Sequence, residues 1–158
     1  MSNQLRVAVS GAGGRMGREV VEAVMGAGID MALAGAADPV YVGQSVSDAL
    51  GLDSQVLIQG ELASVMASSS IDSVVVFSLP STAMDDIRAA MKSGAVPVVG
   101  TTGISQDNLA EIRQLSRDNG VGAIIAPNFA IGAILMMKVA GEIAKYMPAV
   151  EIIEYHHD

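Results

Sequence analysis

Short apolar runs alternate with longer stretches of helical period along most of this chain, and that alternation limits its fold more than any other feature. The apolar runs lack the alternating polar residues of strands that have one face in water. We therefore expect buried strands at residues 5–10, 31–37, 55–59, 73–77, 96–99 and 121–126. Helical period covers residues 15–26, 61–68, 80–92 and 106–118. The order predicts an α/β fold, with a parallel sheet covered by helices on both faces.

Two of these helices carry more detailed signals. In the helix over residues 15–26, the spacing of Met16, Val20 and Val24 predicts that they share the buried face. At the start of the helix over residues 80–92, Thr82 and Asp85 have the spacing of a capping box. Thr82 is therefore expected to accept a hydrogen bond from the first turn.

A glycine-rich turn follows the first predicted strand, in the segment Ser10-Gly11-Ala12-Gly13-Gly14-Arg15-Met16-Gly17. Met16 breaks the strict G-x-G-x-x-G spacing, and the spacing that fits is Gly11-x-x-Gly14-x-x-Gly17. In this pattern Gly11 permits the tight turn, Gly14 a close backbone approach, and Gly17 the packing of helix on strand. A strand followed by such a turn and a helix directs free backbone N–H groups at an anion, which here would be a pyrophosphate. This arrangement predicts that the parallel sheet is of the Rossmann type. A purely structural turn is the alternative for this loop taken alone.

Asp38 lies at the end of the second predicted strand, 21 residues after Gly17. An acidic residue there can accept hydrogen bonds from the adenosine ribose hydroxyls of a dinucleotide. Asp38-Pro39 is also a turn signal, and both roles are compatible. No arginine follows Asp38 to bind a 2′-phosphate, so NADH is favoured over NADPH, although Arg15 and Arg18 lie near the turn and could supply such a contact.

Three further motifs fall at the ends of later strands. They are Phe77-Ser78-Leu79-Pro80, Gly100-Thr101-Thr102-Gly103 and Ala126-Pro127-Asn128-Phe129. Each alone could be an ordinary loop. Because the carboxyl ends of parallel strands meet at one edge, together they are expected to line the nicotinamide half of a crevice.

The two histidines of the chain, His156 and His157, are adjacent and follow an apolar run. We expect a helix over residues 131–147 and then a strand over residues 149–155 that presents this pair. Imidazole titrates near physiological pH, so the pair is a candidate proton donor or anion-binding group. From the residues alone, a solvated pair is the more favoured interpretation.

Composition argues against several classes of function. The chain has no cysteine, which excludes disulfides and thiolate metal sites and suits a reducing, cytoplasmic compartment. Its net charge of −8, with nine lysines and arginines and no basic run, argues against nucleic-acid binding. The apolar stretch at residues 124–137 is interrupted by Pro127-Asn128 and is too short to span a bilayer, and no secretion signal is visible. We expect no metal site and no membrane partner.

The sequence resembles the dihydrodipicolinate reductases of the diaminopimelate and lysine pathway. The resemblance is carried by the glycine turn from Val9 to Gly17, by Gly100-Thr101-Thr102-Gly103, by Asn128-Phe129 and by Glu151-Ile152-Ile153-Glu154-Tyr155-His156-His157. It implies a two-domain oxidoreductase, usually a homotetramer. Such an enzyme reduces the dicarboxylate 4-hydroxy-tetrahydrodipicolinate to tetrahydrodipicolinate with NADH or NADPH.

The resemblance also implies roles for individual residues. The dinucleotide would be held by Gly11, Ala12, Gly13, Gly14, Arg15, Met16 and Asp38, and its reactive ring contacted by Gly100, Thr101, Thr102, Ala126, Pro127, Asn128 and Phe129. His156 would be the catalytic acid/base residue and His157 would bind substrate.

This chain departs from the family pattern after the histidine pair. The family continues with a lysine and a Pro-Ser-Gly-Thr segment that bind the substrate, and neither is present here. We therefore expect a dinucleotide-binding domain at residues 1–130, and at residues 131–158 the first helix and strand of an incomplete substrate-binding and tetramerisation domain. Such a chain is expected to be inactive alone. The alternatives are a stand-alone, non-catalytic dinucleotide-binding sensor module, and another Rossmann-type dehydrogenase, which would leave the histidine strand unexplained.

Overall fold

The computed structural model describes residues 4–126, 128–147 and 149–153. The chain divides into two compact units, Met1–Pro127 and Asn128–Asp158. The division lies near the boundary expected after residue 130. That the second unit begins a substrate-binding domain stays a prediction.

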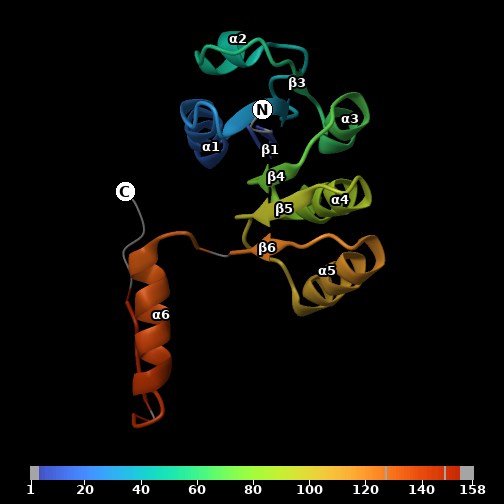
Figure 1. The fold of residues 1–158 in the computed structure, drawn as a ribbon. Helices are drawn as coiled ribbons and strands as arrows, with labels where there is room; N and C mark the ends of the chain where they lie inside the picture. The colour runs from blue at the N-terminus through green and yellow to red at the C-terminus, as the bar shows by residue number, and fades with distance from the viewer. Residues whose placement is uncertain (1–3, 127, 148, 154–158) are drawn as a thin grey trace. The chain divides into compact units, whose positions relative to one another are not determined.

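The first unit is a parallel six-stranded sheet with helices, as the alternation predicts (Figure 1). Its strands are β1 (Leu5–Ser10), β2 (Met31–Ala37), β3 (Ile58–Gln59), β4 (Ser73–Val76), β5 (Val96–Val99) and β6 (Ile124–Ile125). Its helices are α1 (Arg15–Gly26), α2 (Val46–Leu50), α3 (Leu62–Ser68), α4 (Pro80–Lys92) and α5 (Gln106–Asn119). The strand order β3-β2-β1-β4-β5-β6 reverses direction at β1, as in a Rossmann-type fold.

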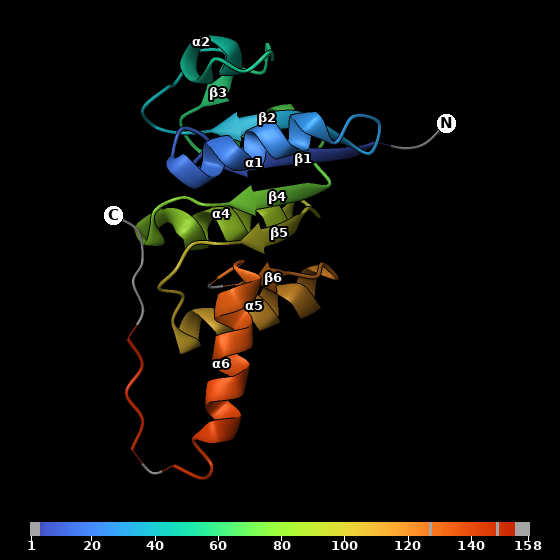
Figure 2. The same ribbon diagram turned by 90° about the vertical axis from the view of Figure 1, so that its left-hand side faces the viewer.

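Helices cover both faces of the sheet, as Figures 1 and 2 show. Helices α3, α4 and α5 lie on one face, while α1 lies on the other. Successive strand residues point to opposite faces, so Ala8 and Ala37 join the core under α3 and α4, whereas Val9 and Ala36 join the core under α1 and α2. The strands are therefore predominantly apolar, because both faces are covered.

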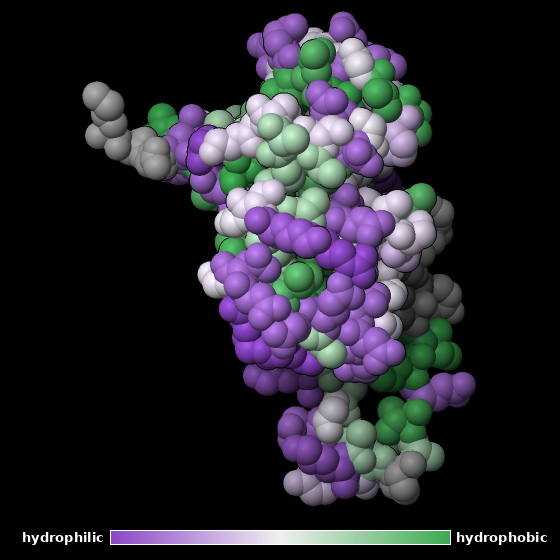
Figure 3. Space-filling view, turned by 90° about the vertical axis from the view of Figure 1, so that its right-hand side faces the viewer, coloured by the Kyte–Doolittle hydropathy of each residue, from purple (hydrophilic) through white to green (hydrophobic). Residues whose placement is uncertain are grey.

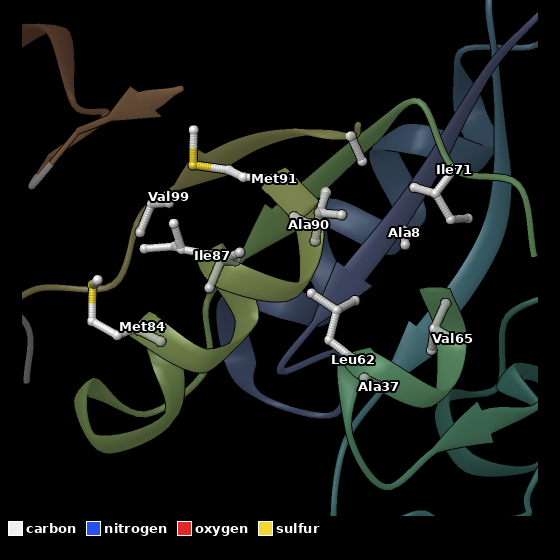
Figure 4. Close-up of a cluster of buried hydrophobic side chains, with 14 of the residues drawn as sticks. Ala8, Ala37, Leu62, Val65, Ile71, Met84, Ile87, Ala90, Met91 and Val99 are labelled. Carbon is white, nitrogen blue, oxygen red and sulfur yellow. The ribbon is translucent and has the colours of Figure 1, made fainter. Parts of the chain in front are cut away.

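The larger core lies between the sheet and helices α3, α4 and α5. Figure 4 shows its part under α3 and α4. Leu62, Ile87 and Met91 are almost completely buried there. Alanines such as Ala8 and Ala90 let the helices approach the strands closely, and methionines fill the remaining space. An aliphatic core of this kind explains how the unit packs with so few aromatic residues.

The outer surface of these helices is mainly hydrophilic, and Figure 3 shows hydrophilic residues gathered over α4 and α5. Arg88 of α4 donates to both carboxylate oxygens of Glu111 in α5, at 2.6 and 2.9 Å. The same guanidinium donates to Asp85 at 2.8 Å. This bidentate contact ties the outer sides of α4 and α5 together.

A second bidentate pair joins β1 to the start of β4. Arg6 donates from Nε to Asp72 Oδ2 at 3.0 Å and from Nη2 to Oδ1 at 2.7 Å. The backbone N–H of Arg6 also donates to Asp72 Oδ2 at 2.8 Å. These hydrogen bonds from Arg6 lower the pKa of Asp72 to about 2.

Replacing Asp72 by asparagine is expected to lower the Tm at neutral pH, by an amount that shrinks in acid. Because the folded-state pKa lies below the unfolded one, the ion pair stabilises the fold fully above about pH 4 and is lost as pH falls toward 2. Thermal melts of both proteins between pH 7 and 2 measure this difference. A Tm gap that stays constant over that range would contradict the assignment.

Several local expectations are wrong. Helix α1 buries Gly17, Val21 and Val24, while Met16 is 47% exposed, because the helix turns the glycine toward the strand. Helix α4 begins after Leu79 without a side-chain cap, and the Thr82 hydroxyl donates to the Leu79 carbonyl instead of capping the first turn.

The two strands at the edges of the sheet depart most from the spans expected from the sequence. β3 and β6 are two residues long, because only two residues of each pair with a neighbour. The short helix α2 was not expected; Ser45 caps it by accepting a hydrogen bond from the N–H of Asp48 at 3.0 Å.

The second unit contains helix α6 (Ile131–Ile143), which is shorter than the expected span of residues 131–147. No described residue of α6 is buried, although the helix is strongly apolar. Residues 149–153 form no strand, so the expected strand over residues 149–155 is absent from its described part. A strand requires a partner for its backbone groups, and apolar composition alone does not supply one.

Candidate functional site

A cavity of about 590 Å³ opens at the carboxyl ends of β1, β2 and β4. This edge holds the point where the strand order reverses, between β1 and β4, and ligands of open α/β sheets bind there. Its lining comes from the glycine turn, the loop after β2, the start of α3, the loop after β4 and the start of α4. The residues are Ser10, Gly11, Gly13, Gly14, Ala37, Asp38, Pro39, Val40, Tyr41, Gly60, Glu61, Leu62, Phe77, Ser78, Leu79, Thr82, Asp85 and Asp86.

The glycine turn is packed so closely that side chains are excluded from it. Gly11 has φ +77°, and a Cβ there would lie 2.6 Å from the carbonyl oxygen of Phe77. A Cβ on Gly17 would overlap the carbonyl oxygen of Gly11. Gly11 therefore serves the tight turn, as its spacing predicts, whereas Gly17 packs α1 on that turn and not on the strand itself.

The turn leaves the amino end of α1 open to a ligand. Gly14 is the N-cap residue and provides no side-chain hydrogen bond, and no acidic residue lies in the first turn. The first N–H groups of a helix have no partner within the helix, and its dipole favours an anion at this end. With Gly11, Gly13 and Gly14 in the cavity wall, this end of α1 fits a pyrophosphate.

Asp38 links the glycine turn to the loop after β2. Its Oδ2 accepts a hydrogen bond from the N–H of Gly13 and its Oδ1 one from the N–H of Val40, both at 2.9 Å. The residue is 7% exposed and lines the cavity. An ionised carboxylate can accept about four hydrogen bonds, so about two positions remain for ligand hydroxyls. Asp38 thus serves the turn and is free to bind a ribose.

Acidic side chains dominate the charge around the cavity. Its wall includes Asp38, Glu61, Asp85 and Asp86, and among the described residues that line it there is no lysine or arginine. Arg15 and Arg18 of α1 are exposed and are not among the lining residues. The described lining therefore offers no cationic side chain to an anionic group of a ligand.

Asp86, which lines the cavity, joins the end of β1 to the loop after β4. Its Oδ2 accepts the hydroxyl of Ser10 at 2.8 Å and that of Ser78 at 2.6 Å. Burial raises the pKa of Asp86, the two serine hydroxyls act in the opposite direction, and the nearby charge of Asp85 raises it further. A buried carboxylate with two donors is therefore part of the lining of this cavity.

The end of β5 follows on the same edge of the sheet. Thr101 is 7% exposed, and its hydroxyl donates to the carbonyl of Ser78 at 2.9 Å. Gly100 and Ala126 extend the pairing of β5 with β4 and of β6 with β5: their N–H groups donate to Val76 and Val99, each at 2.9 Å. Gly100, Thr101, Thr102 and Ala126 lie outside the cavity lining.

The remaining predicted site residues lie elsewhere in the chain. Asn128 and Phe129 belong to the second unit, where the Asn128 side chain accepts a hydrogen bond from the N–H of Ala130 at 2.8 Å. Pro127, His156 and His157 lie outside the described residues. Arg15 and Met16 begin α1.

The sequence interpretation missed Asp86, Tyr41 and Glu61. A signal for Asp86 was present, since it falls among Ala83, Ile87 and Ala90 on the helical period of the buried face of α4, where an unpaired acid is rare. Tyr41 packs beside Gly13, at the place that a Cβ on Gly13 would occupy. No comparable signal in the sequence marks Tyr41 or Glu61. Their positions in the cavity wall depend on the conformations of the loop after β2 and of the segment that leads into α3.

The described residues contain no group of three or more His, Cys, Asp or Glu side chains arranged to hold a metal ion. Within the same residues, no helix has the length and apolarity to cross a bilayer.

The sequence matches the family model described as "Dihydrodipicolinate reductase, N-terminus" over residues 5–129. It is 46% identical over 155 residues to a 4-hydroxy-tetrahydrodipicolinate reductase of Moorella thermoacetica, covering 98% of this chain and 58% of that protein. A relative of the same name from Syntrophomonas wolfei is 40% identical, with 100% of this chain and 59% of the relative covered. The chain thus spans less than two thirds of the relatives that it matches.

Solved structures agree with this similarity. A dipicolinate-bound dihydrodipicolinate reductase from Paenisporosarcina sp. TG-14 superposes with a TM-score of 0.77 at 36% identity, over 98% of this chain and 59% of that one. The WlbA dehydrogenase from Thermus thermophilus, solved with NAD and alpha-ketoglutarate, superposes with a TM-score of 0.66 at 16% identity, over 88% of this chain and 47% of that one. The second likeness concerns the fold alone.

Proposed function

The chain belongs to the dihydrodipicolinate reductase family, and we propose that it is the dinucleotide-binding part of a 4-hydroxy-tetrahydrodipicolinate reductase. The observation that carries this proposal is the pairing of Asp38 with the glycine turn at the carboxyl edge of the sheet, beside the point where the strand order reverses. A cofactor with a pyrophosphate and an adenosine ribose matches the two groups that meet there. The stand-alone sensor module has no specific observation in its favour.

We assign the adenosine and pyrophosphate to the cavity at β1, β2 and β4. The N–H groups at the start of α1 bind the pyrophosphate, with Gly11, Ala12, Gly13, Gly14, Arg15 and Met16 forming the surrounding turn. Asp38 accepts hydrogen bonds from the ribose hydroxyls. The acidic wall favours NADH, since the 2′-phosphate of NADPH would lie among carboxylates without a cation in the lining.

The reactive half of the cofactor is assigned to the ends of β5 and β6. Gly100, Thr101, Thr102, Ala126, Pro127, Asn128 and Phe129 would orient the nicotinamide, which when bound supplies the reducing equivalents. Thr101 holds the loop after β5 against Ser78. This fixed backbone favours one orientation of the ring.

The second unit is assigned to a substrate-binding and tetramerisation domain. His156 would donate the proton and His157 would bind the dicarboxylate substrate of a diaminopimelate and lysine pathway enzyme. Helix α6 exposes Leu135, Met137 and Val139, and an apolar helix of this kind suits burial against further protein. We expect the whole enzyme to be a cytoplasmic homotetramer.

The chain is expected to bind NADH but to show no reductase activity on 4-hydroxy-tetrahydrodipicolinate. Reduction of an electron-poor ring needs cationic groups against the developing negative charge, and the residues assigned to the reactive half of the cofactor include no lysine or arginine. Fluorescence titration with NADH and an assay of substrate-dependent NADH oxidation measure the two activities. Turnover would contradict the assignment as a cofactor-binding part, and no NADH binding would overturn the proposed function.

A further inference from the structure

We propose that Asp86 is a positioning residue for the dinucleotide: its carboxylate holds Ser10 and Ser78 and thereby fixes the glycine turn against the loop after β4. The inference rests on the proposed function, because it takes the cavity to be the dinucleotide site. It adds a residue from α4, outside the glycine turn and outside Asp38.

The geometry of the three residues supports this role. Ser10 is the last residue of β1 and immediately precedes Gly11, while Ser78 lies in the loop after β4. Both hydroxyls donate to the same oxygen, Oδ2 of Asp86, at 2.8 and 2.6 Å. Ser10 is 3% exposed and Asp86 8%, so water competes little for these bonds. Hydrogen bonds to an ionised acceptor are short and strong.

The two loops that Asp86 joins are also in direct backbone contact. The N–H of Phe77 donates to the carbonyl of Ser10 at 2.9 Å. On the next residue, Gly11, a Cβ would lie 2.6 Å from the carbonyl oxygen of Phe77. A small shift of either loop would therefore move the N–H groups that meet the pyrophosphate.

The charge of Asp86 acts against an anionic ligand. Asp86 lines the same cavity as Gly11, Gly13 and Gly14, where we assign the pyrophosphate. A carboxylate repels a pyrophosphate, so Asp86 does not serve to attract the ligand. Its hydrogen bonds favour dinucleotide binding by fixing the loops, while its charge opposes it. The two effects can be separated because an amide side chain keeps an oxygen acceptor without carrying the charge.

Asp86→Asn and Asp86→Ala separate them, since both variants lack the charge and only asparagine keeps an oxygen acceptor. We expect Asp86→Asn to bind NADH about tenfold tighter than Asp86→Ala, the size expected when buried hydroxyls lose their acceptor. Asp86→Asn should bind at least as tightly as the unchanged chain. The Kd for NADH is measured by fluorescence titration, and the Tm by thermal melting.

The double variant Ser10→Ala/Ser78→Ala provides a second route if Asp86→Ala does not fold. It keeps the charge and loses both hydrogen bonds, so we expect NADH to bind about tenfold more weakly than to the unchanged chain. Asp72→Asn and Asp72→Ala are matched controls: Asp72 accepts hydrogen bonds from Arg6 at the start of β4, away from the cavity, and should change the Tm alone.

Equal Kd values for Asp86→Asn and Asp86→Ala would overturn the inference, even if their Tm values differed, because Asp86 would then be purely structural. An unchanged Kd in the double serine variant would also overturn it. If the unchanged chain bound no NADH, the proposed function and this inference would fall together. If the unchanged chain binds NADH but Asp86→Asn and Asp86→Ala bind it equally well, the proposed function stands and only the role of Asp86 is overturned.

Discussion

Replacing Gly17 by alanine is expected to destabilise the first unit and to abolish dinucleotide binding. The new Cβ would overlap the Gly11 carbonyl oxygen and would lie 2.9 Å from the Cα of Ala12. Both are backbone atoms of the turn, so no side chain can move aside, and α1 must shift away from β1. Overpacking of this kind costs about 3 kcal/mol or more. That corresponds to a fall in Tm of roughly 10 °C for a chain of this size.

Gly26→Ala is the matched control, because Gly26 lies in the same helix and a Cβ there would meet nothing within 4 Å. Without strain, the change to alanine restricts the unfolded chain and is expected to stabilise the fold by about 0.5 kcal/mol. Thermal melts and NADH titration of both variants test the pair. Gly17→Ala with an unchanged Tm and an unchanged Kd would show that the turn does not need this contact.

The strands were predictable because their burial depends mainly on composition. Apart from Arg6, β1, β2, β4 and β5 consist of small or apolar residues, and a sheet covered on both faces is the environment that suits them. The edge strands were less predictable. β3 extends only as far as its pairing with Ala36 and Ala37. The sequence of a strand does not show over how many residues the neighbouring strand will pair with it.

Local signals also had limits within the helices. Five residues are too few for α2 to show a helical period, although Ser45 with Asp48 and then Gly51 at φ +70° mark its two ends. In α1 the apolar period suggested Met16 on the buried face, whereas the close contact with the turn selects Gly17. Tertiary packing here decides between neighbouring positions.

The candidate site was predictable where it follows a chain-local pattern. The glycine turn and Asp38 were found from spacing alone, and the hydrogen bond between Gly13 and Asp38 brings them together. The contact of Asp86 with Ser10 spans 76 positions and was not visible as a pattern. The histidine pair lies outside the described residues, so its role stays a prediction.

Replacing Asp38 by alanine is expected to weaken NADH binding by tenfold or more. The change removes the acceptor for the ribose hydroxyls and also the hydrogen bonds that Asp38 accepts from Gly13 and Val40. A hydrogen bond to a charged group contributes about 1.5–3 kcal/mol, so the loss of even one ribose bond accounts for roughly tenfold in the Kd, and the loss of two for roughly a hundredfold or more. Asp48→Ala is the control, since Asp48 accepts a local hydrogen bond from Ser45 and is outside the cavity lining.

Discrimination against NADPH should be lost in the same variant. In the unchanged chain the carboxylates of Asp38 and Glu61 repel a 2′-phosphate, so NADH is expected to bind more tightly than NADPH. Asp38→Asn isolates this effect, because it keeps one oxygen acceptor and removes only the charge. Its ratio of NADPH to NADH dissociation constants should fall toward one, and the fall should be smaller at high salt. A ratio that is unchanged in Asp38→Asn would mean that selection against the 2′-phosphate comes from shape, with the tight packing of Tyr41 beside Gly13 as its cause.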